Sequence, residues 1–245
     1  MRIFKKQRFR IALVIVLTAV LACITAFAVY VNIYYHAEPV AVQAMGSVEP
    51  ISVYELRDGV TVFAPEEPLA GFIFYPGGKV EHIAYAPLLH ACAERQILCV
   101  LIRMPCNLAV LNANGADSIQ EQFPEIGRWY IGGHSLGGAM AASYAADHAG
   151  KWDGLVLLAA YSTQDLSQSG LSVLSVYGTE DGVLDMEKYE QYRSNLPADT
   201  VEIVIDGGCH AGFGHYGAQD GDGIPAISSD EQIVRTVDEI EKVIN

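Results

Sequence analysis

One serine in the middle of the chain is flanked by glycines in a pattern that could hold a nucleophile. Residues 132–138 read GGHSLGG, so Gly133 and Gly137 each lie two positions from Ser135. A G-x-S-x-G motif between a strand and a helix forms a tight turn that exposes the serine hydroxyl. Glycines at both flanking positions let such a turn close without clashes of Cβ atoms. A structural glycine-rich turn is the alternative interpretation.

A serine hydroxyl is a poor nucleophile until a base removes its proton. Of the seven histidines, His210 and His215 lie in the stretch GGCHAGFGHYG, directly after the last expected strand. His210 closely follows a glycine pair at the strand exit, where a loop could carry the imidazole over the serine turn. We predict His210 as the base, with His215 as the alternative.

The base in turn needs a carboxylate that fixes its tautomer and stabilises the imidazolium. Asp181 lies in the loop YGTEDGVLD that leaves the preceding expected strand, and we predict it as this acid. Glu180 and Asp185 are near alternatives, whereas Asp206 is too close to His210 in the chain. The resulting order of serine, acid and histidine differs from the orders in chymotrypsin and subtilisin.

Acyl transfer also needs two hydrogen-bond donors for the developing oxyanion. The N–H of Leu136, next to the serine, is one candidate. The second is expected in the loop PGGK that follows the apolar stretch AGFIFYP, where we choose the N–H of Gly78. An ordinary Pro-Gly turn would have the same composition.

The elements that must position these residues alternate along the chain. Residues 51–65 form two alternating runs joined at Arg57-Asp58-Gly59, which predicts a hairpin. Apolar strands are expected at 70–76, 97–103, 128–135, 154–160, 171–178 and 200–206. Helices are expected at 82–96, 113–123, 136–150 and 186–196, and a last helix begins with a capping box of Ser229 and Gln232. This pattern predicts an α/β domain with a mostly parallel sheet covered by helices on both faces.

The N-terminus adds a segment of a different kind. Residues 11–31 carry no charge, and 21 helical residues at about 1.5 Å each span a bilayer core. The first ten residues carry five cations, which predicts a cytoplasmic basic N-terminus and an extracytoplasmic remainder. Residues 32–49 are then a tether and residues 50–245 the α/β domain. A cleaved signal peptide ending at Ala26-Phe27-Ala28 is the alternative.

Charge and cysteine content exclude some classes of partner. The rest of the chain carries 10 basic and 29 acidic residues, which disfavours nucleic-acid binding. Outside the first helix, the cysteines match no zinc-binding spacing, and we expect no metal site. They are Cys92, Cys99, Cys106 and Cys209. Outside the cytoplasm Cys106 and Cys209 could pair, although four free thiols fit the sequence equally well.

The motifs together resemble those of the α/β-hydrolase superfamily over residues 50–245. The matching stretches are FYPGGKV, GGHSLGGAMA, YGTEDGV and GGCHAGFGHYG. More narrowly, the chain is similar to the small, lidless branch near dienelactone hydrolase, often found as membrane-anchored "alpha/beta hydrolase fold-5" proteins. The resemblance implies an α/β-hydrolase fold, Ser135 as nucleophile, His210 as base, Asp181 as acid and no cofactor. The chain departs from dienelactone hydrolase in having serine rather than cysteine as nucleophile.

The expected function is therefore a membrane-tethered serine hydrolase that acts outside the cytoplasm on a small carboxylic ester or related acyl bond. Only about ten residues separate the strands at 154–160 and 171–178, too few for a lid over the site. An acyltransferase or peptidase with the same triad is one alternative. A catalytically silent binding module with the hydrolase fold is another.

Overall fold

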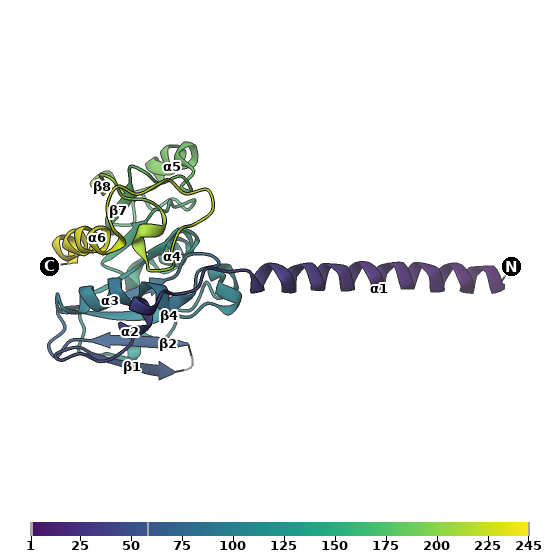
Figure 1. Cartoon of the computed structure of the whole chain (residues 1–245), viewed down its shortest axis with the longest axis horizontal. Helices are drawn as coiled ribbons and strands as arrows, with labels where there is room; N and C mark the ends of the chain where they lie inside the picture. Colours follow the sequence, from purple (N-terminus) through teal and green to yellow (C-terminus); the bar gives the residue numbers. More distant parts are fainter. Residues whose placement is uncertain (1, 58, 245) are drawn as a thin grey trace. The chain divides into compact units, whose positions relative to one another are not determined.

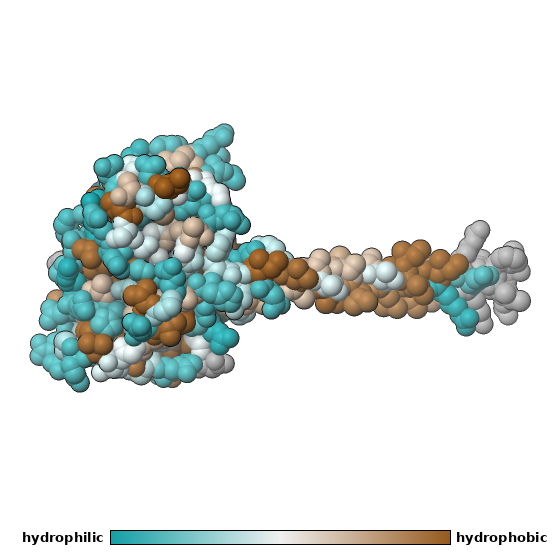
Figure 2. Space-filling view, viewed as in Figure 1, coloured by the Kyte–Doolittle hydropathy of each residue, from teal (hydrophilic) through white to brown (hydrophobic). Residues whose placement is uncertain are grey.

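The structure is a computed structural model that describes residues 2–57 and 59–244, and it divides into two compact units between Tyr34 and Tyr35. The first unit contains α1 (Arg2–Asn32), whose visible surface is largely apolar (Figure 2). Its stretch Phe9–Asn32 is long and apolar enough to cross a membrane. Anchors and signal sequences share this property, so the helix is compatible with both.

In the second unit, the described residues form an eight-stranded sheet in the order β1-β2-β4-β3-β5-β6-β7-β8. Figure 1 labels β1, β2, β4, β7 and β8 of this sheet. β2 is antiparallel to its neighbours β1 and β4, and all other neighbouring strands are parallel. The strands are β1 (Ser52–Arg57), β2 (Val60–Ala64), β3 (Ala70–Tyr75), β4 (Ile97–Ile102), β5 (Trp129–His134), β6 (Gly154–Leu158), β7 (Ser172–Gly178) and β8 (Val201–Ile205). The predicted α/β fold with a mostly parallel sheet is confirmed.

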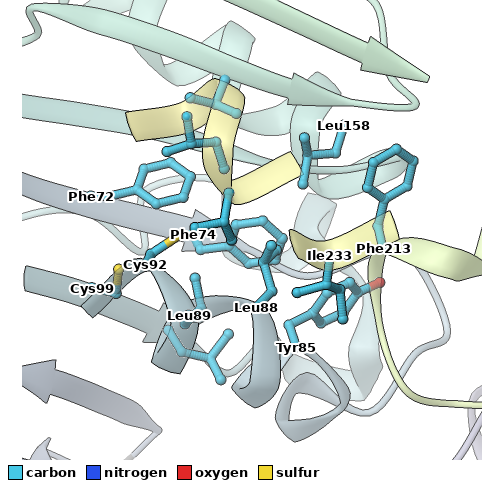
Figure 3. Close-up of a cluster of buried hydrophobic side chains, with 14 of the residues drawn as sticks. Phe72, Phe74, Tyr85, Leu88, Leu89, Cys92, Cys99, Leu158, Phe213 and Ile233 are labelled. Atoms are coloured by element: carbon cyan, nitrogen blue, oxygen red, sulfur yellow. The ribbon is translucent and has the colours of Figure 1, made fainter. Parts of the chain in front are cut away.

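Helices cover both faces of this sheet because its central strands are apolar on both faces. Along β3, Phe72 and Phe74 pack into the core under α3 (Ala86–Ala93) and α6 (Ser229–Ile244), as Figure 3 shows. Ile73 and Tyr75 belong to the opposite core, under α4 (Leu136–Asp147). The other α-helices of this unit, among the residues that the structure describes, are α2 (Pro39–Gln43) and α5 (Met186–Tyr192). The continuous burial of β3 and β4 explains why neither strand alternates between apolar and polar residues.

Three sequence-based expectations about helices need correction. Residues 113–123 contain no α-helix, only the 3-10 turn Gln120–Gln122. The stretch begins with turns at Asn112 and Asn114, and Ser118 has a φ of 61°, which an α-helix does not allow. The helix expected at 82–96 begins as a 3-10 turn, His82–Tyr85, and α3 ends at Ala93.

The third correction concerns the start of α6. Ser228, rather than Ser229, caps the helix, since its Oγ accepts the N–H of Glu231 at 3.1 Å. The Gln232 side chain does not reach back to close a capping box. It instead accepts the N–H of Cys209 at 3.0 Å and donates to the Cys209 carbonyl at 2.8 Å. The last helix therefore holds the backbone next to His210.

The parallel strands direct the candidate site residues to one edge of the sheet. Gly78, Ser135, Asp181 and His210 each follow the carboxyl end of a strand, namely β3, β5, β7 and β8. In an open α/β sheet this edge is where ligands bind. Residues 159–171, which join β6 and β7, contain neither helix nor strand, so no lid domain is inserted there.

Candidate active site

Ser135 occupies a sharp turn between β5 and α4. Its φ of 52° and ψ of −122° lie where a non-glycine residue is strained. Two backbone hydrogen bonds hold this conformation. The Ser135 N–H donates to the Leu158 carbonyl at 2.9 Å, and its own carbonyl accepts the N–H of Ala139 at 3.1 Å. The side chain is half-buried and lies at the N-terminus of α4, whose dipole favours negative charge.

The flanking glycines allow this turn to pack against the end of β3. A Cβ on Gly133 would overlap the carbonyl oxygen of Tyr75. A Cβ on Gly137 would overlap the carbonyl oxygens of both Tyr75 and Pro76. Glycine at both positions therefore brings the serine turn next to the loop that carries Gly78.

His210 and Asp181 form a buried pair on neighbouring loops. The Nδ1 atom of His210 lies 2.9 Å and 3.1 Å from the two carboxylate oxygens of Asp181, and the side chains are only 2% and 1% exposed. Asp181 is itself oriented, because its Oδ1 accepts the N–H groups of Val183 and Leu184 at 2.9 Å and 2.8 Å. Since Nδ1 donates to the carboxylate, Nε2 carries the free lone pair in the neutral ring.

The imidazole of His210 lies next to the residue that precedes Ser135. His210 packs against His134, the residue before Ser135, with ring centroids 4.5 Å apart. Among the described residues, Nε2 of His210 is buried and has no hydrogen-bond partner. The structure shows no hydrogen bond from Ser135 to His210, a contact that in free enzymes often tightens only when substrate binds. The arrangement leaves a buried base available for a proton.

His134 links the serine turn to the loop after β3. Its Nδ1 lies 2.8 Å from the hydroxyl of Tyr85, which also accepts the N–H of Gly77 at 3.1 Å. The Tyr85 hydroxyl thus joins the backbone of Gly77 to the ring of His134 through two buried hydrogen bonds. Burial, and secondarily the neighbouring His210, lower the pKa of His134 well below its usual value. His134 is thus a neutral structural group.

The hydrogen bond to Tyr85 also distinguishes the two glycines of the loop. The N–H of Gly77 is engaged, whereas that of Gly78 has no acceptor among the described residues. A Cβ on Gly78 would lie 2.9 Å from Cδ2 and 3.3 Å from Cβ of Leu136. The N–H of Leu136, at the first position of α4, has no intrahelical acceptor. Two backbone donors without partners therefore lie beside Ser135.

Asp222 is an organising residue that the sequence analysis missed. Its Oδ1 accepts the N–H groups of Gly182, His210 and Gly223 at 3.1, 3.1 and 2.9 Å, and its Oδ2 accepts that of Ala211 at 2.8 Å. Burial raises the pKa of Asp222, but these backbone donors lower it by more, so the net pKa is below its usual value. One carboxylate thus ties the loop of Asp181 to the loop of His210.

The alternative residues considered from the sequence lie in other environments. Asp185 caps α5 by accepting the N–H of Lys188 at 3.1 Å. Glu180 is exposed and accepts from Thr179 Oγ1, and Asp206 is also exposed. His215 pairs with carboxylates other than Asp181, at 3.4 Å from Glu38 and 3.0 Å from Asp230.

The cysteines show no pairing in the described part of the chain, so Cys106 and Cys209 are both free thiols. Cys106 is exposed, whereas Cys209 is buried beside the site. Burial, together with the nearby Asp222 carboxylate, raises the pKa of the Cys209 thiol to about 11, so it stays protonated at neutral pH. A protonated thiol is a weak nucleophile, which leaves Ser135 as the candidate.

The family assignment agrees with this geometry. The sequence pattern of the alpha/beta hydrolase family matches residues 71–234, a range that includes Gly78, Ser135, Asp181 and His210. The chain belongs to this family. Family membership confirms the resemblance inferred from the motifs, and it supports a hydrolase. A comparison with curated proteins gives no match.

Solved structures with the same fold include esterases and lipases. A dienelactone hydrolase from Anabaena variabilis is similar at 12% identity with a TM-score of 0.58, over 78% of this chain and 96% of the other. A monoacylglycerol lipase from Paleococcus ferrophilus is 14% identical with a TM-score of 0.58, over 78% and 99% of the chains. A carboxyl esterase from the mycorrhizal fungus Tuber melanosporum is 12% identical with a TM-score of 0.58, over 86% and 91%. These likenesses concern the fold.

Proposed function

We propose that this alpha/beta hydrolase is a membrane-anchored serine hydrolase that cleaves small carboxylic esters or related acyl bonds outside the cytoplasm. The observation that carries the proposal is the buried His210–Asp181 pair. Its imidazole packs against His134, the residue before the strained Ser135, and its Nε2 has no hydrogen-bond partner among the described residues. Ser135 is the nucleophile, His210 the base and Asp181 the acid that orients it. The N–H groups of Gly78 and Leu136 are the oxyanion donors.

The reaction follows from these positions. Ser135 Oγ attacks the carbonyl carbon while its proton moves to Nε2 of His210, and the carbonyl oxygen becomes an oxyanion held by two N–H groups. When the tetrahedral intermediate collapses, the bond to the leaving oxygen breaks and the imidazolium protonates that oxygen. Water then repeats the sequence on the acyl-enzyme, releasing the acid and restoring the serine. Asp181 keeps its charge throughout and stabilises the imidazolium.

The size of the substrate follows from what covers the site. The segment between β6 and β7 is short and has neither helix nor strand, so it supplies no lid that could cover a long acyl chain with apolar side chains. Without such a cover, the alkyl groups of a long ester stay in contact with water, and the protein gains little from binding them. Esters of short carboxylic acids with small alcohols are therefore the preferred substrates.

The function is tested by labelling the full-length protein with a fluorophosphonate, which forms a phosphorus–oxygen bond to an activated serine and releases fluoride. We expect one adduct, on Ser135, that is lost in Ser135→Ala and on heat denaturation. Ser194→Ala, which removes an exposed serine away from the sheet edge, is the matched control and should label normally. A folded protein that does not label would overturn the nucleophile assignment and favour a binding module.

The anchor and its orientation are supported by α1 and by the cations that precede its apolar stretch. Outside α1, Cys106 is the exposed free thiol of the described residues. A membrane-impermeant maleimide should label it in intact cells, and Cys106→Ser should abolish that label. Labelling only after lysis would contradict an extracytoplasmic site. Loss of residues 1–28 from the mature protein, seen by intact mass, would replace the anchor with a signal peptide.

A further inference from the structure

The four residues 35–38, here called the strap, pair with the loop that carries Gly78. The N–H of Tyr35 donates to the Lys79 carbonyl at 2.8 Å, and the Tyr35 carbonyl accepts the N–H of Glu81 at 2.9 Å. These bonds make a parallel bridge between Tyr35 and Val80. The N–H of Ala37 adds a bond to the Glu81 carboxylate at 2.9 Å. The backbone immediately after Gly78 is therefore held by the strap.

The strap also contacts the loop that carries His210. The N–H of Glu38 donates to the His215 carbonyl at 2.8 Å, and its carboxylate lies 3.4 Å from Nδ1 of the same residue. The ring of Tyr35 packs against Tyr216, with centroids 5.7 Å apart. The strap is thus fixed at both ends. Tyr35 binds the loop that carries Gly78, and Glu38 binds the loop that carries His210.

A third contact joins the strap to the loop of Asp222. The Tyr35 hydroxyl accepts the N–H of Asp220 at 3.0 Å, two residues before the carboxylate that binds the backbone of His210. Tyr35 therefore connects, through its backbone and its side chain, the two sides of the site. Gly78 follows β3 and His210 follows β8, and in the sheet these strands are separated by β5, β6 and β7.

We propose that the strap is a positioning element of the active site. It fixes the position of the loop that carries Gly78 relative to the loop that carries His210. The inference rests on the proposed function, in which the N–H of Gly78 and the imidazole of His210 act on the same substrate molecule. An oxyanion donor stabilises the transition state only when it lies about 3 Å from the oxyanion, so a small shift of Gly78 relative to His210 lowers kcat. The affinity for the substrate in the ground state depends less on the position of Gly78 relative to His210.

The test uses full-length protein in detergent, with Tyr35→Ala, Tyr35→Phe and the control Tyr54→Phe. Tyr54 is exposed on the edge strand β1, so the loss of its hydroxyl should leave activity unchanged. Tyr35→Ala should lower kcat for a short ester roughly tenfold with KM within twofold, which is less than the roughly 100-fold loss on deleting an oxyanion donor. Tyr35→Phe, which keeps the ring against Tyr216 and loses only the hydroxyl, should recover most of that loss.

Hydrogen exchange gives a readout that does not depend on activity. Tyr35→Ala should speed amide exchange in both residues 76–82 and 208–217, while peptides from β5 keep the wild-type rate and show that the fold is intact. Faster exchange in one loop only, or in neither, would overturn the strap. If wild type hydrolyses the ester and Tyr35→Ala has the same kcat, the strap is also overturned. If wild type neither hydrolyses esters nor reacts with fluorophosphonate, the proposed function fails, and the exchange result alone decides the strap.

Discussion

Asp222→Asn is the substitution whose effect the structure defines most closely. The carboxylate accepts four backbone N–H groups, three at Oδ1 and one at Oδ2. Asparagine can keep its carbonyl oxygen at the Oδ1 position, but its NH2 group then faces the N–H of Ala211 as a second donor. The variant thus loses one bond and replaces three charge-assisted bonds by weaker neutral ones.

The magnitude follows from typical bond energies. Because Asp222 is half-buried, we take about 1 kcal/mol for the bond lost and about 1 kcal/mol in total for the three weakened ones. A loss of about 2 kcal/mol lowers the unfolding midpoint of a domain of this size by roughly 4–8 °C. The protein should stay folded at 25 °C, because stabilities of about 5–15 kcal/mol are usual.

The pH dependence supplies a second check on the same residue. The folded-state pKa of Asp222 is lowered, so its contribution is present above its unfolded pKa and is lost as the pH falls through the folded value. The stability difference between wild type and Asp222→Asn should be constant from about pH 5 to pH 8 and shrink below about pH 4.

Thermal unfolding and the rate of fluorophosphonate labelling are the assays for Asp222→Asn. Asp220→Asn is the matched control, because that side chain is exposed in the same loop and its backbone bond to Tyr35 is retained. We expect the labelling rate of Asp222→Asn to fall roughly tenfold, since the bond to the His210 N–H is weakened and the bond to the N–H of the neighbouring Ala211 is lost. Equal unfolding midpoints and equal labelling rates for both variants would refute the reasoning.

Two further substitutions probe the loop after β3. Tyr85→Phe leaves the N–H of Gly77 and Nδ1 of His134 without a partner in a buried site, which should cost about 2–4 kcal/mol of unfolding free energy in urea. A cost below about 1 kcal/mol would contradict that account. Gly78→Ala places a methyl against Leu136 and should lower kcat roughly tenfold with little change in KM. Gly127→Ala, where an added Cβ meets nothing within 4 Å, is the control for adding a methyl group without a new contact.

Features of the site that depend on local sequence could be predicted. Ser135 and its glycines form a motif within seven residues, and the apolar runs at β3, β4 and β5 are long enough to identify buried strands. Order along the chain then places Asp181 and His210 at the same sheet edge. Each of these inferences uses information within one or two adjacent elements.

Features that depend on contacts between distant segments could not be predicted. Asp222 looks like part of a QDGDG turn, because nothing local indicates that its oxygens accept amides from two other loops. Gln232 has the spacing of a capping box, yet its side chain binds the backbone of Cys209 instead. Residues 35–38 have the composition of a spacer, and only the folded chain shows that they form hydrogen bonds to two loops of the site.

The two sides of Ser135 impose a direction on any ester that reacts there. Ser135 follows β5. Gly78 follows β3, the neighbour of β5 on one side, and His210 follows β8, which lies on the other side of β5 beyond β6 and β7. The carbonyl oxygen must then point towards β3 while the leaving oxygen stays within reach of His210. Only one face of the carbonyl is attacked, and the two substituents of a secondary alcohol meet different surroundings. The proposed hydrolase should therefore be enantioselective, consuming one mirror image of a racemic ester faster than the other.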